Sequence, residues 1–269
     1  MDQLLSAVSA GVRIFDLGQP LEPTIPVSPN HPPFRTALMR RHGDTVRADG
    51  SSAANDLFTS GTHVGTHVDA LSHVSLNDHL FGGASASEAQ KGGRFATHGI
   101  EQMPPLVCRG VLLDIPRLKG VDCLEPEQAV TASDLEAAAT AQGVEVREGD
   151  VVLIRTGWPK HWLDPVFFLG HDTGVPGPDS SAAHWLSEHG AVCTGAETVA
   201  FEQIIAGRGH TLLPVHVHLL VEAGINIIEM LNLTDLAAAG VSEFTFVLAP
   251  LKIVGATGSP VRPLAVVSA

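Results

Sequence analysis

The chain has 269 residues, 44% of them hydrophobic, so a single α/β domain of this length can bury an ample core. Its formal charge of −13 argues against nucleic acid or an anionic membrane as a partner, because both bind basic surfaces. The three cysteines are odd in number and form no CxxC pair, which indicates neither a disulfide framework nor a thiolate zinc site.

The amino-terminal residues lack the basic region of a secretory signal, and no apolar stretch approaches the roughly 20 residues of a membrane span. We therefore expect a cytoplasmic protein with a small-molecule substrate. Six prolines fall within residues 20–33 and indicate a surface arm pinned to the body. We expect one domain over residues 1–269, with residues 1–33 as an arm that could reach a neighbour in a homo-oligomer, a dimer or a tetramer.

Residues 61–74 read Gly-Thr-His-Val-Gly-Thr-His-Val-Asp-Ala-Leu-Ser-His-Val. Three histidines and an aspartate, namely His63, His67, Asp69 and His73, fall within eleven positions of this stretch. Imidazole and carboxylate are ligands of a divalent cation such as zinc or manganese. Histidines also cap helices and pack in cores, and a chain with fourteen of them clusters some by chance. The density of ligand types favours a metal site.

Local geometry decides whether these residues can share one ion. On a straight strand, four residues span roughly 13 Å, too far for His63 and His67 to meet on one metal. The β-branched neighbours make a helix unfavourable, so we predict a bend at Gly65, where a residue without a β-carbon is free to turn. His67 and Asp69 then share one face of an extended segment, and His73 follows one short turn later.

Further along, helical stretches alternate with short apolar runs typical of buried strands. Ser133 and Glu136 predict a capping box for the first of these helices. This alternation favours an α/β fold, and a closing hairpin makes its sheet mixed. The predicted units are helix 133–141 with strand 151–154, helix 180–188 with strand 191–193, helix 214–223 with strand 225–231, and hairpin strands 244–248 and 261–267.

Trp158, Trp162 and the pair Phe167–Phe168 follow the strand predicted at 151–154. Loops at strand ends often build pockets, so an aromatic substrate surface is one interpretation. Packing in the core or at an interface is the other, and we favour it. Cys193 lies in an apolar run and is expected to be a buried small hydrophobe.

A second pair of ligand types flanks the turn between helix 214–223 and its strand. His216 lies eight residues before the turn at Gly224, about 12 Å of helix, and Glu229 lies five residues after it, about 16 Å of strand. The side chains of His216 and Glu229 are therefore expected to lie next to each other. His218 fits less well and is the second choice, while a capping histidine and an ordinary strand carboxylate remain the alternative.

The run from His63 to Asp69, followed by His73, is similar to the H-x-G-T-H-x-D-x-x-x-H signature of the metal-dependent cyclase family, which includes bacterial kynurenine formamidases and isatin hydrolases. The resemblance implies a swivelling β/β/α architecture, and Asp69 bridging two metal ions if His216 and Glu229 bind a second one. Further matching segments are Phe15-Asp16-Leu17, Val152 to Trp158, Gly177-Pro178-Asp179, Pro214-Val215-His216, Ile228-Glu229 and Leu248 to Leu251.

The chain departs from the formamidase pattern at two places. Leu71 stands where formamidases usually have proline two residues after the motif aspartate. The spacing from His216 to Glu229 is one residue longer than in the formamidase pattern. The resemblance therefore implies the family and leaves the substrate open.

The ligand set predicts the chemistry. A zinc or manganese ion held by His63, His67 and Asp69, alone or with a second ion at His216 and Glu229, would lower the pKa of bound water toward 7 and supply hydroxide. His73 is then predicted to be the general base and acid, with a structural histidine as the alternative. We expect hydrolysis of an amide, lactam or ester of a small aromatic substrate, as in arylformamidases and isatin hydrolases. A polyketide-type cyclase or lyase that stabilises an enolate, and a metal-binding scaffold without turnover, are the alternatives.

Overall fold

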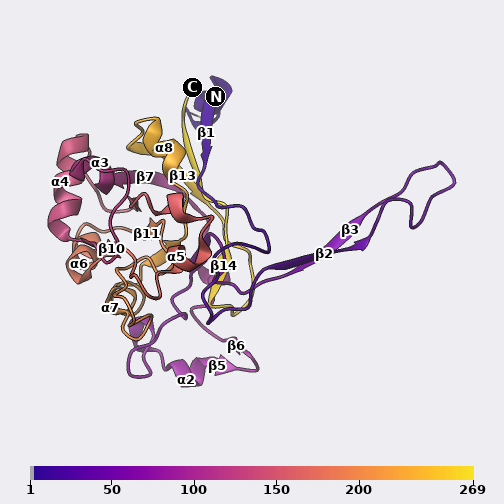
Figure 1. Ribbon diagram of the computed structural model, residues 1–269, viewed down its shortest axis with the longest axis horizontal. Coiled ribbons are helices and arrows are strands. Elements are labelled where there is room, and N and C mark those ends of the chain that lie inside the picture. The colour runs from indigo at the N-terminus through magenta and orange to yellow at the C-terminus, as the bar shows by residue number, and fades with distance from the viewer. Residues whose placement is uncertain (1–2) are drawn as a thin grey trace.

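The computed structural model describes residues 3–269 and consists of one α/β domain around a mixed sheet of nine strands (Figure 1). The strand order is β1-β15-β13-β7-β9-β11-β12-β4-β14. These strands are β1 (Val12–Asp16), β4 (His67–Asp69), β7 (Leu106–Asp114), β9 (Val151–Arg155), β11 (Cys193–Ala196), β12 (Asn226–Glu229), β13 (Glu243–Leu248), β14 (Gly258–Pro260) and β15 (Leu264–Ser268).

The remaining elements are short helices and three two-stranded sheets. The helices are α1 (Gln3–Ser9), α2 (Ala86–Ala89), α3 (Ile115–Lys119), α4 (Ala132–Gln142), α5 (Pro165–Leu169), α6 (Ser180–Glu188), α7 (Pro214–His216), a π-helix η4 (Val217–Ala223) and α8 (Thr234–Ala238), with 3-10 turns η1 (Phe81–Gly83), η2 (Ile100–Gln102) and η3 (Trp158–His161). The two-stranded sheets pair β2 (Arg35–Arg40) with β3 (Asn55–Thr59), β5 (Gln90–Lys91) with β6 (Arg94–Phe95), and β8 (Ala129–Val130) with β10 (Gly177–Pro178).

The centre of the sheet is parallel and buried on both faces. Strands β7, β9, β11 and β12 run parallel, and antiparallel strands flank them on both sides. Side chains alternate along β9, so that Val152 and Ile154 pack beneath α4 and α6, while Val151 and Leu153 pack with residues of β13 and α8. A strand covered on both faces is apolar throughout, which explains the unbroken Val-Val-Leu-Ile run.

The other predicted helix and strand units are confirmed, with shifts of up to three residues at their ends, whereas the helix predicted at 214–223 is α-helical only over Pro214–His216 and continues as the π-helix η4. The prediction of the first cap was wrong, because the N-cap of α4 lies two residues earlier, at Thr131, which forms the capping box with Asp134. Strands β13 and β15 pair antiparallel as expected. They are not a simple hairpin, since their connection contains β14, which pairs with β4 instead.

The aromatic residues after β9 belong to the core. Trp158 and Phe168 are fully buried in a hydrophobic cluster that also contains Ile25, Phe34 and Val64. The proline-rich segment is thus anchored by Ile25, and the motif loop by Val64. Cys193 is fully buried, as predicted, and all three cysteines are free thiols. No helix within residues 3–269 combines the length and hydropathy needed to cross a bilayer.

Candidate metal centre

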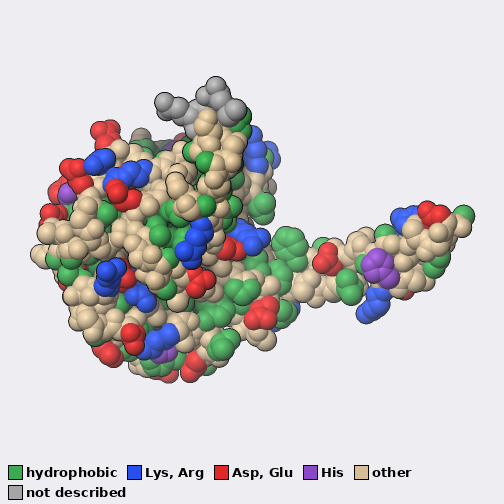
Figure 2. All heavy atoms as spheres, turned by 90° about the horizontal axis from the view of Figure 1, so that it is seen from above, with side chains coloured by type: hydrophobic (Ala, Val, Ile, Leu, Met, Phe, Trp, Pro, Cys, Tyr) green, Lys and Arg blue, Asp and Glu red, His purple; other side chains and the backbone are tan. Residues whose placement is uncertain are grey.

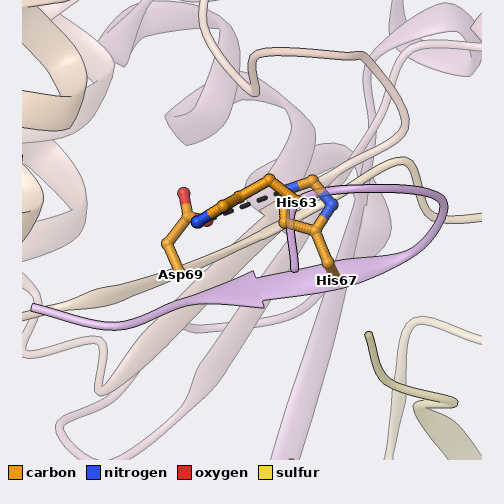
Figure 3. Close-up of side chains that lie close together, drawn as sticks. All are labelled: His63, His67 and Asp69. Carbon is orange, nitrogen blue, oxygen red and sulfur yellow. Dashed lines mark hydrogen bonds and ion pairs between the residues drawn. The ribbon is translucent and has the colours of Figure 1, made fainter. Parts of the chain in front are cut away.

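The bend expected in the motif is present at Gly65, which has a φ of +65°. The turn brings the His63 ring back to the first residues of β4, and Nδ1 of His63 lies 2.7 Å from Oδ1 of Asp69 (Figure 3). His67 donates from Nδ1 to the Gly65 carbonyl at 2.8 Å, so its Nε2 faces the carboxylate at 3.6 Å. A hydrogen bond at Nδ1 fixes the tautomer that leaves Nε2 free to bind a metal.

Asp69 lies at the centre of this arrangement and is completely buried. Strand β4 is held between β12 and β14, and Asn226 on β12 donates a hydrogen bond to the Asp69 carbonyl. Burial opposes ionisation of this carboxyl, but the imidazoles of His73 and His63 hold its pKa well below the usual range. Its Oδ2 has no hydrogen-bond partner among the described residues. A buried carboxylate oxygen of this kind is suited to a cation.

The side chains of His216 and Glu229 lie next to each other, as the spacing predicted. Nε2 of His216, at the end of α7, lies 3.1 Å from Oε1 of Glu229 on β12 and 3.7 Å from Oδ2 of Asp69. The other ring nitrogen of His216 donates to Glu202 at 2.7 Å, and the His216 backbone N–H donates to the same carboxylate. Oε2 of Glu229 lies 3.5 Å from Nε2 of His67, which joins the two halves of the site.

The electrostatics of this half of the site favour a cation. Burial opposes charge on His216, but its hydrogen bonds to Glu202 and Glu229 and the charge of Asp69 raise its pKa to about 10. Burial raises the pKa of Glu229 to about 7, and the nearby Asp69 carboxylate adds to this shift. Surroundings that hold a proton this firmly carry an excess of negative charge, which a divalent cation would neutralise in place of the proton.

The donor atoms fit one or two ions. His63, His67 and Asp69 form one group whose ligand atoms lie within 4.8 Å of one another, and Asp69, His216 and Glu229 form another. All five side chains are buried. Imidazole nitrogens with carboxylate oxygens, and no thiolate, match the preferences of zinc and manganese. Because Asp69 belongs to both groups, its carboxylate is positioned to bridge two ions.

His73 lies beside these groups. Its ring stacks on His63 with centroids 3.9 Å apart and lies 6.3 Å from the ring of His216. Burial lowers the pKa of His73 to about 3 against the opposing charge of Asp69, so the imidazole is neutral at pH 7. The geometry therefore places a neutral imidazole at the edge of both ligand groups.

His218, the second choice for the second pair, points away from the centre. It bonds Ser187 and Glu222, and its ring stacks on His184. On a helix, residues two apart lie on different faces, and here only His216 faces β12.

Sequence reasoning missed three residues that build the centre. Glu202 holds His216 in place, Thr257 contacts Nε2 of His63 at 2.9 Å through its hydroxyl, and the His31 ring stacks on that of His63 at 5.3 Å. None of these residues lies in a spaced pattern of ligand types. The only available signal was the position of His31 within the proline-rich segment 20–33, and that pattern points to no ligand.

Comparison with known proteins identifies the family. The Cyclase family profile matches residues 15–203, which is more than half of the chain. The chain belongs to the cyclase family. Among its relatives, the isatin hydrolase of Roseibium aggregatum is 29% identical over 267 residues, covering 97% of this chain and 94% of that protein.

Solved structures agree with this assignment. A crystal structure described as a novel cyclase superposes with a TM-score of 0.86 at 30% identity, covering 97% of this chain and 89% of that one. Isatin hydrolase A from Ralstonia solanacearum superposes with a TM-score of 0.76 at 25% identity, over 99% of this chain and 98% of that one. The resemblance read from the motif is thus confirmed along nearly the whole length of the chain.

The bend at Gly65 yields a first prediction. A β-carbon here would clash with Leu21, and a non-glycine residue at this φ is strained by about 1–2 kcal/mol. We expect Gly65→Ala to lower metal content, because it displaces the two histidines that the bend brings together. Gly82→Ala is the matched control, since Gly82 has a φ of +70° and open space around its Cα. Elemental analysis of both variants is the measurement, and equal metal loss in both would contradict the prediction.

The two histidines of α7 and η4 yield a second prediction. We expect His216→Ala to weaken binding of the second ion by on the order of 10–100-fold or more, because its Nε2 is one of the candidate ligand atoms. His218→Ala should bind metal like the wild type, since His218 faces Ser187 and Glu222. Titration calorimetry with zinc and with manganese measures both. Identical affinities for the two variants would show that His216 is not a ligand.

Proposed function

We propose that this cyclase-family protein is a metal-dependent hydrolase that cleaves an amide, lactam or ester bond in a small aromatic substrate. The observation that carries the proposal is the convergence of four buried ligand-type side chains on a fifth, Asp69, one of whose oxygens has no hydrogen-bond partner among the described residues. Full-length similarity to proteins named isatin hydrolase supports hydrolysis as the reaction class.

His63, His67, Asp69, His216 and Glu229 are the residues that would hold zinc or manganese. When bound, such an ion acidifies water and polarises a carbonyl group. The protein contributes orientation: the Gly65 carbonyl fixes the His67 ring, and Glu202 fixes the His216 ring while raising its basicity as a ligand.

His73 is assigned the proton transfers. The support for this role is position, since its ring lies against His63 at the edge of the ligand groups. A neutral imidazole can accept a proton from water and return it to the departing amine or alcohol, which is general base and acid catalysis at one atom. The same ring is not needed to complete either ligand group.

A cavity of about 420 Å³ offers room for the substrate. Apolar side chains line it, among them Leu169, Val199 and Ile204, together with His210. The cavity lies near the candidate centre, because its lining residue Asn30 adjoins His31, whose ring stacks on that of His63. A volume of this size and an apolar lining suit a substrate built on an aromatic ring.

The reaction class is tested directly. We expect the metal-loaded protein to release a carboxylic acid from at least one of three probe classes: N-formyl aryl amines, isatin-like lactams and aryl esters. Exhaustive chelation should abolish turnover, and zinc or manganese should restore it. Turnover that survives chelation would refute metal dependence. Conversion of a polyketide-type substrate without acid release would favour the cyclase or lyase reaction instead.

Variants of His73 and Asp69 distinguish a role in proton transfer from a role in metal binding. We expect His73→Ala to keep metal content near that of the wild type and to lose at least about 100-fold in kcat, the usual scale of general acid–base catalysis. Asp69→Asn should lose the metal itself, because the carboxylate belongs to both ligand groups. Elemental analysis and steady-state kinetics on the same samples are the measurements. Loss of metal from His73→Ala would make His73 a ligand and overturn its assigned role.

A further inference from the structure

Acidic and basic side chains are interspersed over the face of the body seen in Figure 2, so no surface of one charge marks a further site there. In the interior, one residue of the histidine motif makes contacts that metal binding leaves unexplained. This residue is Thr66, which lies between the bend at Gly65 and the candidate ligand His67. It is buried and belongs to neither candidate ligand group.

The Thr66 hydroxyl joins the motif to two distant segments of the chain. The Gln19 backbone N–H donates to Oγ1 of Thr66 at 2.8 Å, and the hydroxyl itself donates to the Met230 carbonyl at 2.7 Å. The direction of both bonds is fixed, because an N–H can only donate and a carbonyl can only accept. The single hydroxyl proton is therefore directed at Met230.

Met230 directly follows Glu229 and has an unusual backbone conformation. Its φ is +56°, in the left-handed region that residues other than glycine rarely adopt. A strained conformation of this kind persists only where surrounding contacts determine it. Both backbone polar groups of Met230 make such contacts, since its N–H donates to the Thr198 carbonyl at 3.1 Å and its carbonyl accepts from Thr66.

The hydrogen bond from Thr66 to Met230 connects the two ligand groups. Thr66 precedes His67, a member of the first group, and Met230 follows Glu229, a member of the second. His67 and Glu229 are register partners on β4 and β12, and Oε2 of Glu229 lies 3.5 Å from Nε2 of His67. One hydroxyl therefore ties together the backbone beside a ligand of each group.

We propose that Thr66 is a positioning residue: through the Met230 carbonyl it holds Glu229 beside its register partner, and it thereby sets the affinity of the second ion. This inference rests on the metal centre of the proposed function. The His67 ring has its own support, because its Nδ1 is bonded to the Gly65 carbonyl. Loss of the Thr66 hydroxyl therefore acts chiefly on Glu229, whose carboxylate moves when the left-handed residue after it relaxes.

The first experiment compares Thr66→Val and Thr66→Ser by titration calorimetry with zinc and with manganese. Valine keeps the shape of threonine but leaves two buried backbone groups unpaired. We expect Thr66→Val to weaken binding of the second ion by about 10–100-fold, the usual scale for residues that orient a ligand, and to leave the first ion bound. Thr66→Ser keeps the hydroxyl and should bind both ions nearly as the wild type does.

Thr194→Val is the matched control. Thr194 is fully buried, and its hydroxyl donates to the Val152 carbonyl at 2.9 Å, between β11 and β9, neither of which carries a candidate ligand. This variant should lose stability, which thermal unfolding measures, and still bind both ions. Equal weakening of the second ion in Thr66→Val and in the control, or in Thr66→Val and Thr66→Ser, would overturn the proposal.

A double-mutant cycle with Met230→Gly tests the link to the left-handed backbone. Glycine adopts this φ without strain, so the backbone after Glu229 no longer needs the Thr66 hydroxyl to hold it. We expect Thr66→Val to weaken the second ion much less in the Met230→Gly background than in the wild-type background, whatever the glycine itself costs in stability. Equal weakening in the two backgrounds would show that the residues act independently and would refute the positioning role.

The number of ions bound distinguishes failure of this inference from failure of the proposed function. A wild type that binds no ion would refute metal-dependent hydrolysis and the role of Thr66 together. A wild type that binds one ion only, or a Thr66→Val variant that binds two ions as tightly as the wild type, would refute the role of Thr66 and leave hydrolysis at the metal centre standing.

Discussion

The centre depends on one carboxylate that has been removed from water. Asp69 is completely buried, and the cost of burying an isolated carboxylate is so high that such a group is normally protonated or paired. Here neighbouring imidazoles hold its pKa low on one side, while on the other Oδ2 has no hydrogen-bond partner among the described residues. The surrounding strands fix the position of this single charged group. Strand β4 carries it, and its two neighbours in the sheet hold it in register.

The same constraint explains why the centre is assembled from segments far apart in the sequence. β14 passes so close to the ring of His63 that a β-carbon on Gly258 would lie 2.6 Å from its Cε1. On the opposite side, β12 brings Glu229 toward Asp69, although burial and their mutual repulsion raise the pKa of Glu229. The fold therefore holds two carboxyl groups together at a cost in stability. That arrangement becomes favourable once a cation lies between them, so binding and folding are linked.

The sequence predicted the parts of the centre that depend on local geometry. The bend at Gly65 followed from the reach of an imidazole, and the pairing of His216 with Glu229 followed from the rise of a helix against that of a strand. What it could not predict depends on long-range packing. Glu202 reaches His216 only because the loop after β11 returns beneath α7, and no spacing encodes that. The exposed β2–β3 hairpin was also missed, since its alternation of polar and apolar residues is weak and no core selects its register.

The hairpin and the metal centre share one piece of backbone. At the root of the hairpin, the Gly61 N–H donates to the Pro32 carbonyl, and the two stems lead directly to His31 and His63, whose rings stack on each other. The hairpin and the candidate ligand His63 therefore lie on one continuous segment, so that motion of the hairpin is transmitted to His63. Regions with few buried contacts open at low free energy, and a bare hairpin is such a region. A surface that covers the hairpin raises that free energy and steadies the loop from Gly61 to Gly65, on which the position of His63 depends.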